Sequence, residues 1–351
     1  MDDLDKRLLN RIQSDFPLVS RPYLELGQPL GLGEDEVIER TSALKAVRII
    51  RQVSAIFDTK ALGYKSSLVA MRIAAHRINE AAQIINEHPG VTHNYERNHE
   101  YNLWFTIAVP PTSDLEATVD RLHELAGALV TRVMYTLRLF KIGVNLDMTG
   151  ERRPDAMAVP EYGEDDRARA RGSSLSPLDI GVIRELQEDL PVEPRPFAAM
   201  AGRLGTDEDG LFAAAGDLKR RGFLRRFAAI LYHRRAGFKA NGMGVWAVPP
   251  DDVLEIGTRM ASFAAVSHCY QRPTYPDWPY SVFSMVHGRS VEECEEILSA
   301  ISKATGVGEY LSLYSTRDYK KVRLRFYTDG WDRWEAKFLP GRAPTASGVG
   351  T

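Results

Sequence analysis

The chain repeats its own sequence at a constant distance. Leu4-Asp5 recurs as Leu178-Asp179, and Arg21-Pro22-Tyr23 recurs as Arg195-Pro196-Phe197, both at a spacing of 174 residues. The same spacing relates three further pairs: Phe16-Pro17 and Leu190-Pro191, Leu30-Gly31 and Leu204-Gly205, and Gly63-Tyr64-Lys65 and Gly237-Phe238-Lys239. Self-similarity at a fixed period indicates that one structural unit occurs twice. The fold must therefore consist of two similar halves.

The composition is that of a soluble globular protein. With 351 residues, 44% of them hydrophobic, the chain is long enough for two or more cores. No apolar run approaches the roughly 20 residues that span a bilayer, and the N-terminus does not resemble a signal peptide, so we expect a cytoplasmic protein with no membrane partner. Cys269 and Cys294 lack a Cys-x-x-Cys spacing, which argues against a disulfide framework, a zinc knuckle and an iron–sulfur cluster.

Each copy begins with about 50 residues of helical periodicity, broken by glycines and prolines. Three short helices with glycine-marked turns predict a winged helix-turn-helix unit. The pattern that follows alternates in the order βαββαβ, which is the ferredoxin-like unit. The sequence thus predicts an α+β fold in which a helix-turn-helix and a ferredoxin-like unit are duplicated in tandem.

These patterns divide the chain into six segments. They are a first helix-turn-helix at 1–50, a first ferredoxin-like domain at 51–149, a linker at 150–174, a second helix-turn-helix at 175–224, a second ferredoxin-like domain at 225–340, and a disordered tail at 341–351.

A His-x-Tyr-x-Arg motif occurs in both copies. His93, Tyr95 and Arg97 recur as His268, Tyr270 and Arg272, now at a spacing of 175 residues. On an extended strand alternate residues point to the same face, so one wall would present an imidazole, a hydroxyl and a guanidinium together. A repeat that served packing alone would have no reason to keep histidine and arginine.

Longer motifs resemble a known enzyme family. A helix-turn-helix followed by a ferredoxin-like unit is the arrangement of the Lrp/AsnC regulators. Within that class, the second copy resembles the sirohaem (siroheme) decarboxylases through Leu224-Arg225-Arg226-Phe227, His233-Arg234 and Ser267-His268-Cys269-Tyr270. The first copy, with the run 89–97, looks like the partner subunit of the same enzyme. The fusion of both in one chain is similar to the NirD–NirL form of the haem d1 pathway, whereas the form that serves the alternative haem pathway usually has separate subunits.

The resemblance implies a cytoplasmic carboxy-lyase built as an Lrp/AsnC-like pseudo-dimer. In that family the enzyme removes carbon dioxide from two acetate side chains of sirohaem without oxidation, and the product is 12,18-didecarboxysirohaem. The step needs no redox cofactor and no metal of the protein's own, because the iron arrives within the substrate. A positioned proton donor is required, and histidine, with an unperturbed pKa of about 6.5, is the usual choice.

The residue types of the second copy suit this chemistry. We expect His233, His268, Tyr270 and Arg272 to be catalytic, with His233 or His268 either the acid or an axial ligand to the substrate iron. The cations that would meet the substrate carboxylates are Arg225, Arg234, Arg235, Lys239 and Arg272. The remaining walls of the pocket would come from Asn241, Met243, Trp246, Trp278, Tyr280 and His287, together with Phe238.

The first copy has lost part of this set. Asp58, Thr59 and Lys60 stand where the second copy has Tyr232-His233-Arg234. We therefore expect the first half to be largely structural and to close the main pocket. His93, Tyr95 and Arg97 are assigned to substrate binding and, with His99, could also form a second pocket.

Two other functions fit the same architecture. A DNA-binding regulator needs exposed basic residues on its recognition helix, yet 31–45 carries four acidic residues against Arg40 and Lys45, and 205–218 carries four acidic residues and no basic one. We therefore expect no DNA partner. A haem sensor without catalysis would use the same pocket, and only turnover separates it from the enzyme. The sequence is compatible with a homodimer and with separate partner decarboxylase subunits of the same pathway.

Overall fold

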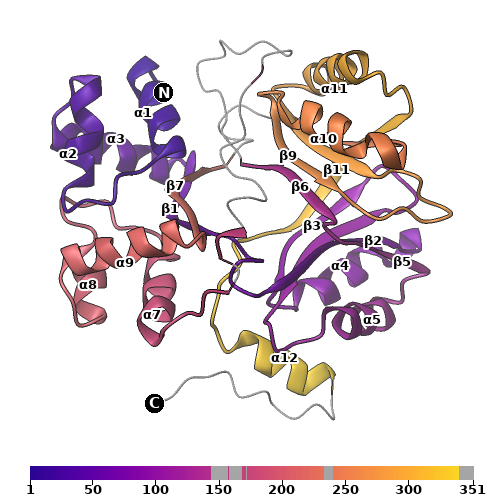
Figure 1. The fold of residues 1–351 in the computed structure, drawn as a ribbon, viewed down its shortest axis with the longest axis horizontal. Coiled ribbons are helices and arrows are strands. Elements are labelled where there is room, and N and C mark those ends of the chain that lie inside the picture. The colour runs from indigo at the N-terminus through magenta and orange to yellow at the C-terminus, as the bar shows by residue number, and fades with distance from the viewer. Residues whose placement is uncertain (144–156, 158–167, 171, 233–239, 340–351) are drawn as a thin grey trace.

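The computed structural model describes residues 1–143, 157, 168–170, 172–232 and 240–339 of the chain. Two helix-turn-helix units lie together on one side of the molecule, and two α/β units lie together on the other (Figure 1). The predicted tail, most of the predicted linker and the run 233–239 lie outside the described residues. Among the described residues, no helix is both long and apolar enough to cross a bilayer.

The helix-turn-helix units are built alike, as the repeat predicted. The first contains α1 (Asp3–Ser14), α2 (Pro22–Gly27), η1 (Gln28–Leu30) and α3 (Glu34–Ala46), and the second contains α7 (Pro177–Leu186), α8 (Ala198–Arg203) and α9 (Glu208–Arg220).

The repeated residues have structural roles in these units. Asp5 and Asp179 each complete a capping box at the start of a helix, closed by Asp2 and Ser176 respectively. Gly31 and Gly205 each follow a short helix with a φ near +70°, a conformation that glycine adopts without strain. The repeat in this part of the chain therefore preserves helix ends and core residues.

The strand after each unit pairs with its counterpart in the other copy. β1 (Ile50–Phe57) and β7 (Leu224–Leu231) form an antiparallel two-stranded ribbon. The N–H of Phe16 donates to the carbonyl of Phe227 at 2.9 Å, and the N–H of Leu190, its counterpart, donates to the carbonyl of Val53 at 2.8 Å. Such reciprocal bonds are the signature of an isologous interface, here formed within one chain.

The two α/β units follow the predicted order. The first has β2 (Lys65–Arg72), η2 (Ala75–Arg77), α4 (Ile78–Asn86), β3 (Val91–Arg97), β4 (Leu103–Val109), α5 (Leu115–Ala126), β5 (Val130–Met134) and β6 (Arg138–Ile142). The second has η3 (Pro250–Asp252) and runs through β8 (Ala240–Trp246), α10 (Val253–Ala261), β9 (Val266–Gln271), β10 (Val282–Gly288), α11 (Val291–Thr305) and β11 (Tyr310–Lys321). The described chain ends with α12 (Gly330–Phe338).

The units exchange the ends of their last strands. The end of the first unit forms two strands: β5 pairs with β2 of its own copy, and β6 crosses to pair with β9 of the other. β11 does the same without a break, because its first half pairs with β8 and its second half with β3. One sheet of nine strands results, in the order β5-β2-β4-β3-β11-β8-β10-β9-β6.

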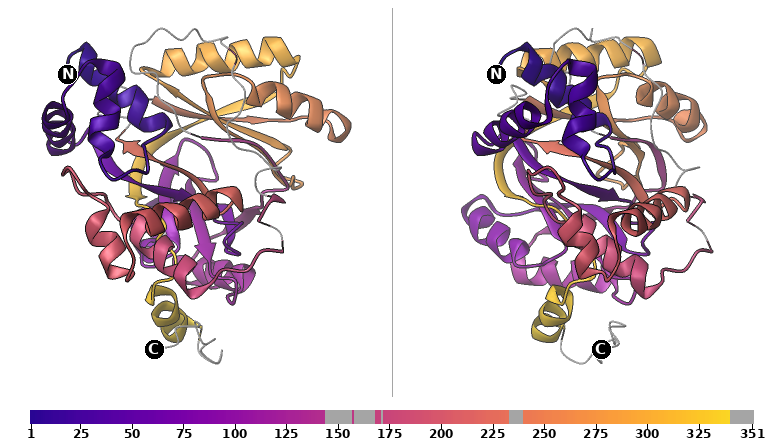
Figure 2. Two further views of the ribbon diagram at one scale, coloured as in Figure 1. Left: turned by 60° about the vertical axis from the view of Figure 1, so that its left-hand side comes forward. Right: turned by 90° about the vertical axis from the view of Figure 1, so that its left-hand side faces the viewer.

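Helices cover the outer faces of this sheet, and the two halves meet at its inner face. α4 and α5 pack on the first half, and α10 and α11 pack on the second. Between the halves lies a cluster that includes Trp104, Trp278 and Phe283. α12 lies at the base of the molecule (Figure 2) and inserts Trp331 into the helix-turn-helix core and Trp334 into the core of the first α/β unit.

The crossing of β6 depends on a glycine in α10. A Cβ atom at Gly257 would collide with the ring of Phe140, a β6 residue, whereas a Cβ at Gly216 of α9 would meet only the Arg220 guanidinium, at 3.6 Å. We predict that Gly257→Ala lowers the free energy of unfolding by about 1–2 kcal/mol, since overpacking outweighs the gain in helix propensity. The matched control Gly216→Ala should raise it by about 0.5 kcal/mol. Urea denaturation measures both, and equal effects would contradict the assignment of this contact.

Candidate active site

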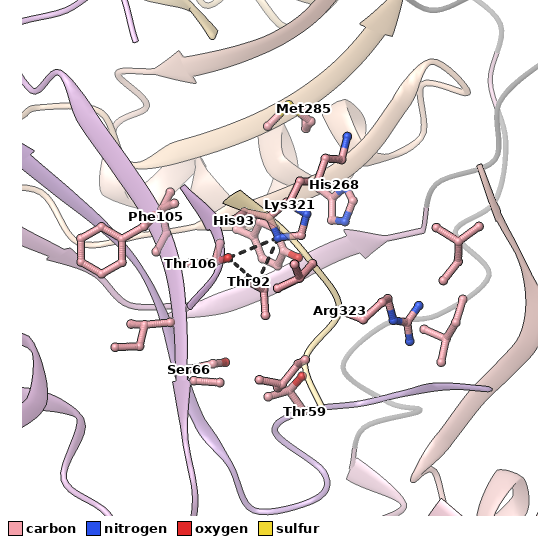
Figure 3. A pocket seen from close by; sticks show the side chains of 18 of the residues that line it. Thr59, Ser66, Thr92, His93, Phe105, Thr106, His268, Met285, Lys321 and Arg323 are labelled. Carbon is pink, nitrogen blue, oxygen red and sulfur yellow. Dashed lines mark hydrogen bonds between the residues drawn. The ribbon is translucent and has the colours of Figure 1, made fainter. Parts of the chain in front are cut away.

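A cavity of about 550 Å³ lies between the β1–β7 ribbon and the inner face of the sheet. This volume is in the range of small-molecule sites. Both copies line it: β2, β3 and β4 contribute from the first, and β8, β9, β10 and the residues after β11 contribute from the second. Figure 3 shows His93 and His268, one from each copy, at the same cavity. The two His-x-Tyr-x-Arg motifs therefore face the same cavity. His93, Tyr95 and Arg97 do not form a separate pocket in the first copy.

A β-bulge fixes the orientation of His268. The register between β9 and β10 shifts so that Ser267 is the extra residue, next to His268. Its hydroxyl lies 2.9 Å from Nδ1 of His268 and 3.0 Å from Nε2 of His287, and donates to the carbonyl of Met285 at 3.2 Å. One hydroxyl thus holds two imidazoles.

These contacts select a tautomer. A hydroxyl has one proton, and the hydroxyl of Ser267 donates it to the carbonyl of Met285. The serine oxygen then accepts from Nδ1–H of His268 and from Nε2–H of His287. Nε2 of His268 is left with its lone pair, which can take up a proton or coordinate iron.

The first copy has the same bulge with different partners. The register between β3 and β4 shifts at Thr92, whose hydroxyl lies 3.0 Å from Nδ1 of His93 and 2.7 Å from the hydroxyl of Thr106. The strands that cross between the copies also differ, because Lys321 is paired with His93 whereas Ile142 is paired with His268. His93 and His268 therefore have the same local backbone geometry but different electrostatic environments.

The cavity keeps its histidines neutral near pH 7. Burial, and then the nearby ionisable groups of His287 and Arg225, lower the pKa of His268 to about 3. Burial and Lys321 lower the pKa of His287 to about 4, and burial with Lys321, Arg51 and Arg323 lowers that of His93 to about 3. His268 therefore does not have the unperturbed pKa that we expected of a general acid.

The arginines of the repeated motif connect the copies. Arg97 donates from Nη1 to the carbonyl of Leu313 at 2.9 Å. Arg272 donates to the carbonyl of Met134, which is the residue of the first copy that corresponds to Leu313. Each guanidinium also lies over the tyrosine of its own motif, at 5.7 Å from the Tyr95 ring and 4.7 Å from the Tyr270 ring. Burial lowers the pKa of both arginines to about 10, so both stay charged at neutral pH.

The described lining is rich in cations and contains no carboxylate. Its charged residues are Arg51, Arg97, Arg225, Arg226, Arg272, Lys321 and Arg323. Apolar and aromatic side chains form much of the remaining wall, among them Leu68, Phe105, Met243, Phe283 and Met285. A flat molecule with several negative charges matches this combination.

Most of the predicted site residues that the structure describes line this cavity. They are His93, Tyr95, Arg97, Arg225, Asn241, Met243, His268, Tyr270, Arg272 and His287. His233, Arg234, Arg235 and Lys239, with Phe238, lie outside the described residues. The sequence patterns did not predict Arg51, Arg226, Lys321 and Arg323, which also line the cavity, or the two bulge hydroxyls. The Thr-His and Ser-His dipeptides, repeated in the two motifs, were the signal for those hydroxyls.

Three predicted wall residues do not line the cavity. On β8, Asn241 and Met243 face the cavity, so by the alternation of a strand Trp246 faces the helices, where its Nε1 donates to Ser284 at 2.9 Å. Trp278 is buried in the cluster between the two halves, and Tyr280 packs on it with ring centroids 5.1 Å apart. These aromatic residues build the core rather than the site.

The helix-turn-helix units present few unpaired basic groups on their acidic helices. Arg40 of α3 bonds Asp2, Asp5 and Glu36, and Lys45 bonds Asp189 at 2.8 Å. Nucleic-acid binding depends on cations that reach phosphates, and these cations are already paired with carboxylates. Residues of the two units pack together in one shared core.

Comparison with known proteins gives the same match in both copies. The model of the siroheme decarboxylase NirDL-like HTH domain matches residues 5–51 and 179–225, and the model of the AsnC-like ligand-binding domain matches 61–141 and 235–320. A siroheme decarboxylase of Hydrogenobacter thermophilus is 38% identical over 95% of this chain and 97% of its own. The chain belongs to the siroheme decarboxylase family.

Other relatives in the family show the same architecture. The crystal structure of siroheme decarboxylase NirDL in complex with an iron-uroporphyrin III analogue superposes with a TM-score of 0.71, at 34% identity over 96% of this chain and 99% of that one. The siroheme decarboxylase beta subunit of Methanosarcina barkeri is 41% identical over 43% of this chain and 99% of its own length. The family thus contains fused chains and single subunits of half this length.

The low pKa of the cavity histidines should make the chain sensitive to acid. An unfolded histidine binds a proton below a pH of about 6.5, whereas His93, His268 and His287 stay neutral in the fold. The free energy of unfolding should therefore fall between pH 7 and 5, by about 2 kcal/mol for each histidine. His268→Gln should remove one such contribution, and urea titrations at several pH values measure it. The exposed His76→Gln is the control, and an equal pH slope in both variants would contradict the prediction.

Proposed function

We propose that the chain is a carboxy-lyase that removes two acetate carboxyl groups of sirohaem, giving 12,18-didecarboxysirohaem in haem d1 biosynthesis. The observation that carries this proposal is the cavity lining, in which seven cationic side chains, three histidines and apolar walls meet without a described carboxylate. Sirohaem is a flat iron macrocycle that carries several carboxylates. The bound iron-uroporphyrin III analogue in the related NirDL structure supports the same class of ligand.

The reaction requires that the protein bind and orient the substrate and supply one proton for each acetate group that loses carbon dioxide. The bond between the acetate methylene and its carboxylate breaks, carbon dioxide leaves, and the macrocycle delocalises the electron pair that remains. A proton added to that carbon gives the methyl group. No electron is gained or lost overall, so the reaction needs no redox cofactor.

His268 and His93 are the proposed proton donors. Burial, and then the surrounding cations, lower the pKa of both histidines and keep them neutral. The carboxylates of a bound substrate would offset these positive charges and raise the pKa of each histidine toward its ordinary value. Protonation would then accompany substrate binding, and the lone pair on Nε2 of His268 is placed to receive the proton or to bind the iron.

A single chain should be sufficient for turnover. The cavity needs β3 from one copy and β9 from the other, and the duplication supplies both. We therefore expect activity without a separate partner subunit, whether or not the chain forms a homodimer.

Mass analysis tests the proposal directly. The purified chain is incubated anaerobically with sirohaem, and we expect two successive losses of carbon dioxide from the tetrapyrrole. His268→Ala should lower the rate by about 10²- to 10⁴-fold, the usual contribution of a positioned acid, whereas His76→Ala should leave it unchanged. Tight binding with an unchanged mass would identify a haem sensor instead, and retardation of DNA by the chain would favour a regulator.

A further inference from the structure

Four arginines gather on one side of the cavity, where the β1–β7 ribbon meets the chain after β11. Arg51 comes from β1, Arg225 and Arg226 from β7, and Arg323 lies two residues after the end of β11. We call these four residues the arginine cluster. Arg51 and Arg225 are counterparts in the repeat, but Arg226 corresponds to Gln52. The cluster is therefore not a simple consequence of the duplication.

Backbone carbonyls orient the cluster. Arg323 donates from Nη2 to the carbonyl of Ala55 at 3.0 Å, near the middle of the ribbon. Arg51 donates from Nη2 to the carbonyl of Lys321 at 3.2 Å, and Arg225 donates to that of Ile142 at 2.6 Å. A guanidinium has five N–H groups, so one bond to a carbonyl fixes its direction while the remaining groups of Arg51 and Arg323 can meet a ligand.

Keeping these four partly buried cations close together is costly. Desolvation, and then the charges of Arg51, Arg225 and Arg226, lower the pKa of Arg323 to about 10, although the group remains charged at neutral pH. A fold that keeps mutually repelling cations beside a cavity gains from an anionic ligand placed there.

We propose that the arginine cluster, with Arg323 at its centre, binds substrate carboxylates that the reaction does not remove. This inference rests on the proposed function and adds a distinction between the carboxylates. An arginine stabilises a localised carboxylate more than the dispersed charge that develops as carbon dioxide leaves, so it would slow decarboxylation of the group that it holds. The cluster therefore suits the side chains that persist in the product, and the reacting acetates suit the apolar walls beside the histidines.

A pair of arginine variants tests this assignment. Arg323→Met removes the central cation, and Arg317→Met removes an exposed arginine of β11 that bonds Asn79 at 2.7 Å. Absorption titration with iron uroporphyrin III gives the dissociation constant, and sirohaem turnover at saturation gives kcat. We expect Arg323→Met to raise the dissociation constant by about 10- to 100-fold and to change kcat by less than about threefold, because a charge-assisted bond is lost while the reacting groups stay in place. Arg317→Met should change neither quantity.

Two further variants separate binding from folding. Arg323→Lys keeps the charge but loses the planar fork, so its dissociation constant should lie between those of the wild type and Arg323→Met. Arg51→Met should weaken binding without removing the bond to Ala55, and it decides the matter if Arg323→Met does not fold. Unchanged affinity in a folded variant, or a loss of kcat with unchanged affinity, would overturn the assignment.

The same data keep this inference distinct from the proposed function. A wild type that binds iron uroporphyrin III but does not decarboxylate sirohaem, together with weak binding by Arg323→Met, would refute the enzyme and retain the carboxylate site. A wild type that decarboxylates sirohaem, together with unchanged binding by Arg323→Met, would support the enzyme and refute the carboxylate site.

Discussion

The exchange of strand ends between the two copies is the constraint on which the rest of the structure depends. β6 completes the sheet beside β9, and the second half of β11 completes it beside β3. β3 and β9 carry the two His-x-Tyr-x-Arg motifs, so neither motif lies at a free edge of the sheet. The exchange also brings Arg97 and Arg272 to carbonyls of the opposite copy, which holds the cavity wall together.

Much of the fold could be predicted because the repeated residues report local structure. Asp5 with Asp179, and Gly31 with Gly205, mark helix starts and turns, and such positions are constrained by hydrogen bonds and φ angles within a few residues. The common face of His268, Tyr270 and Arg272 followed from the alternation of a strand. These are short-range rules, and a sequence is sufficient to apply them.

The rest of the site depends on contacts between distant segments. Trp246 was placed in the pocket because of its residue type, but the face that it occupies is set by the strand in which it lies. Arg51, Arg226 and Arg323 meet only because the ribbon and the end of β11 come together across the fold. The pKa of His268 likewise depends on burial and on charges from both copies, which no local pattern encodes.

Joining the copies in one chain has a consequence for how a ligand is oriented. In a dimer of identical subunits each substitution occurs twice, so a cavity on the two-fold axis presents the same groups to both edges of a macrocycle. Here Lys321 faces His93 where Ile142 faces His268, and Arg226 stands where the first copy has Gln52. A macrocycle with unlike edges then has two docking poses of unequal energy, and a difference of about 1.4 kcal/mol suffices for a tenfold preference. Covalent fusion of two different copies thus gives a cavity that can favour one orientation of the bound macrocycle over the other.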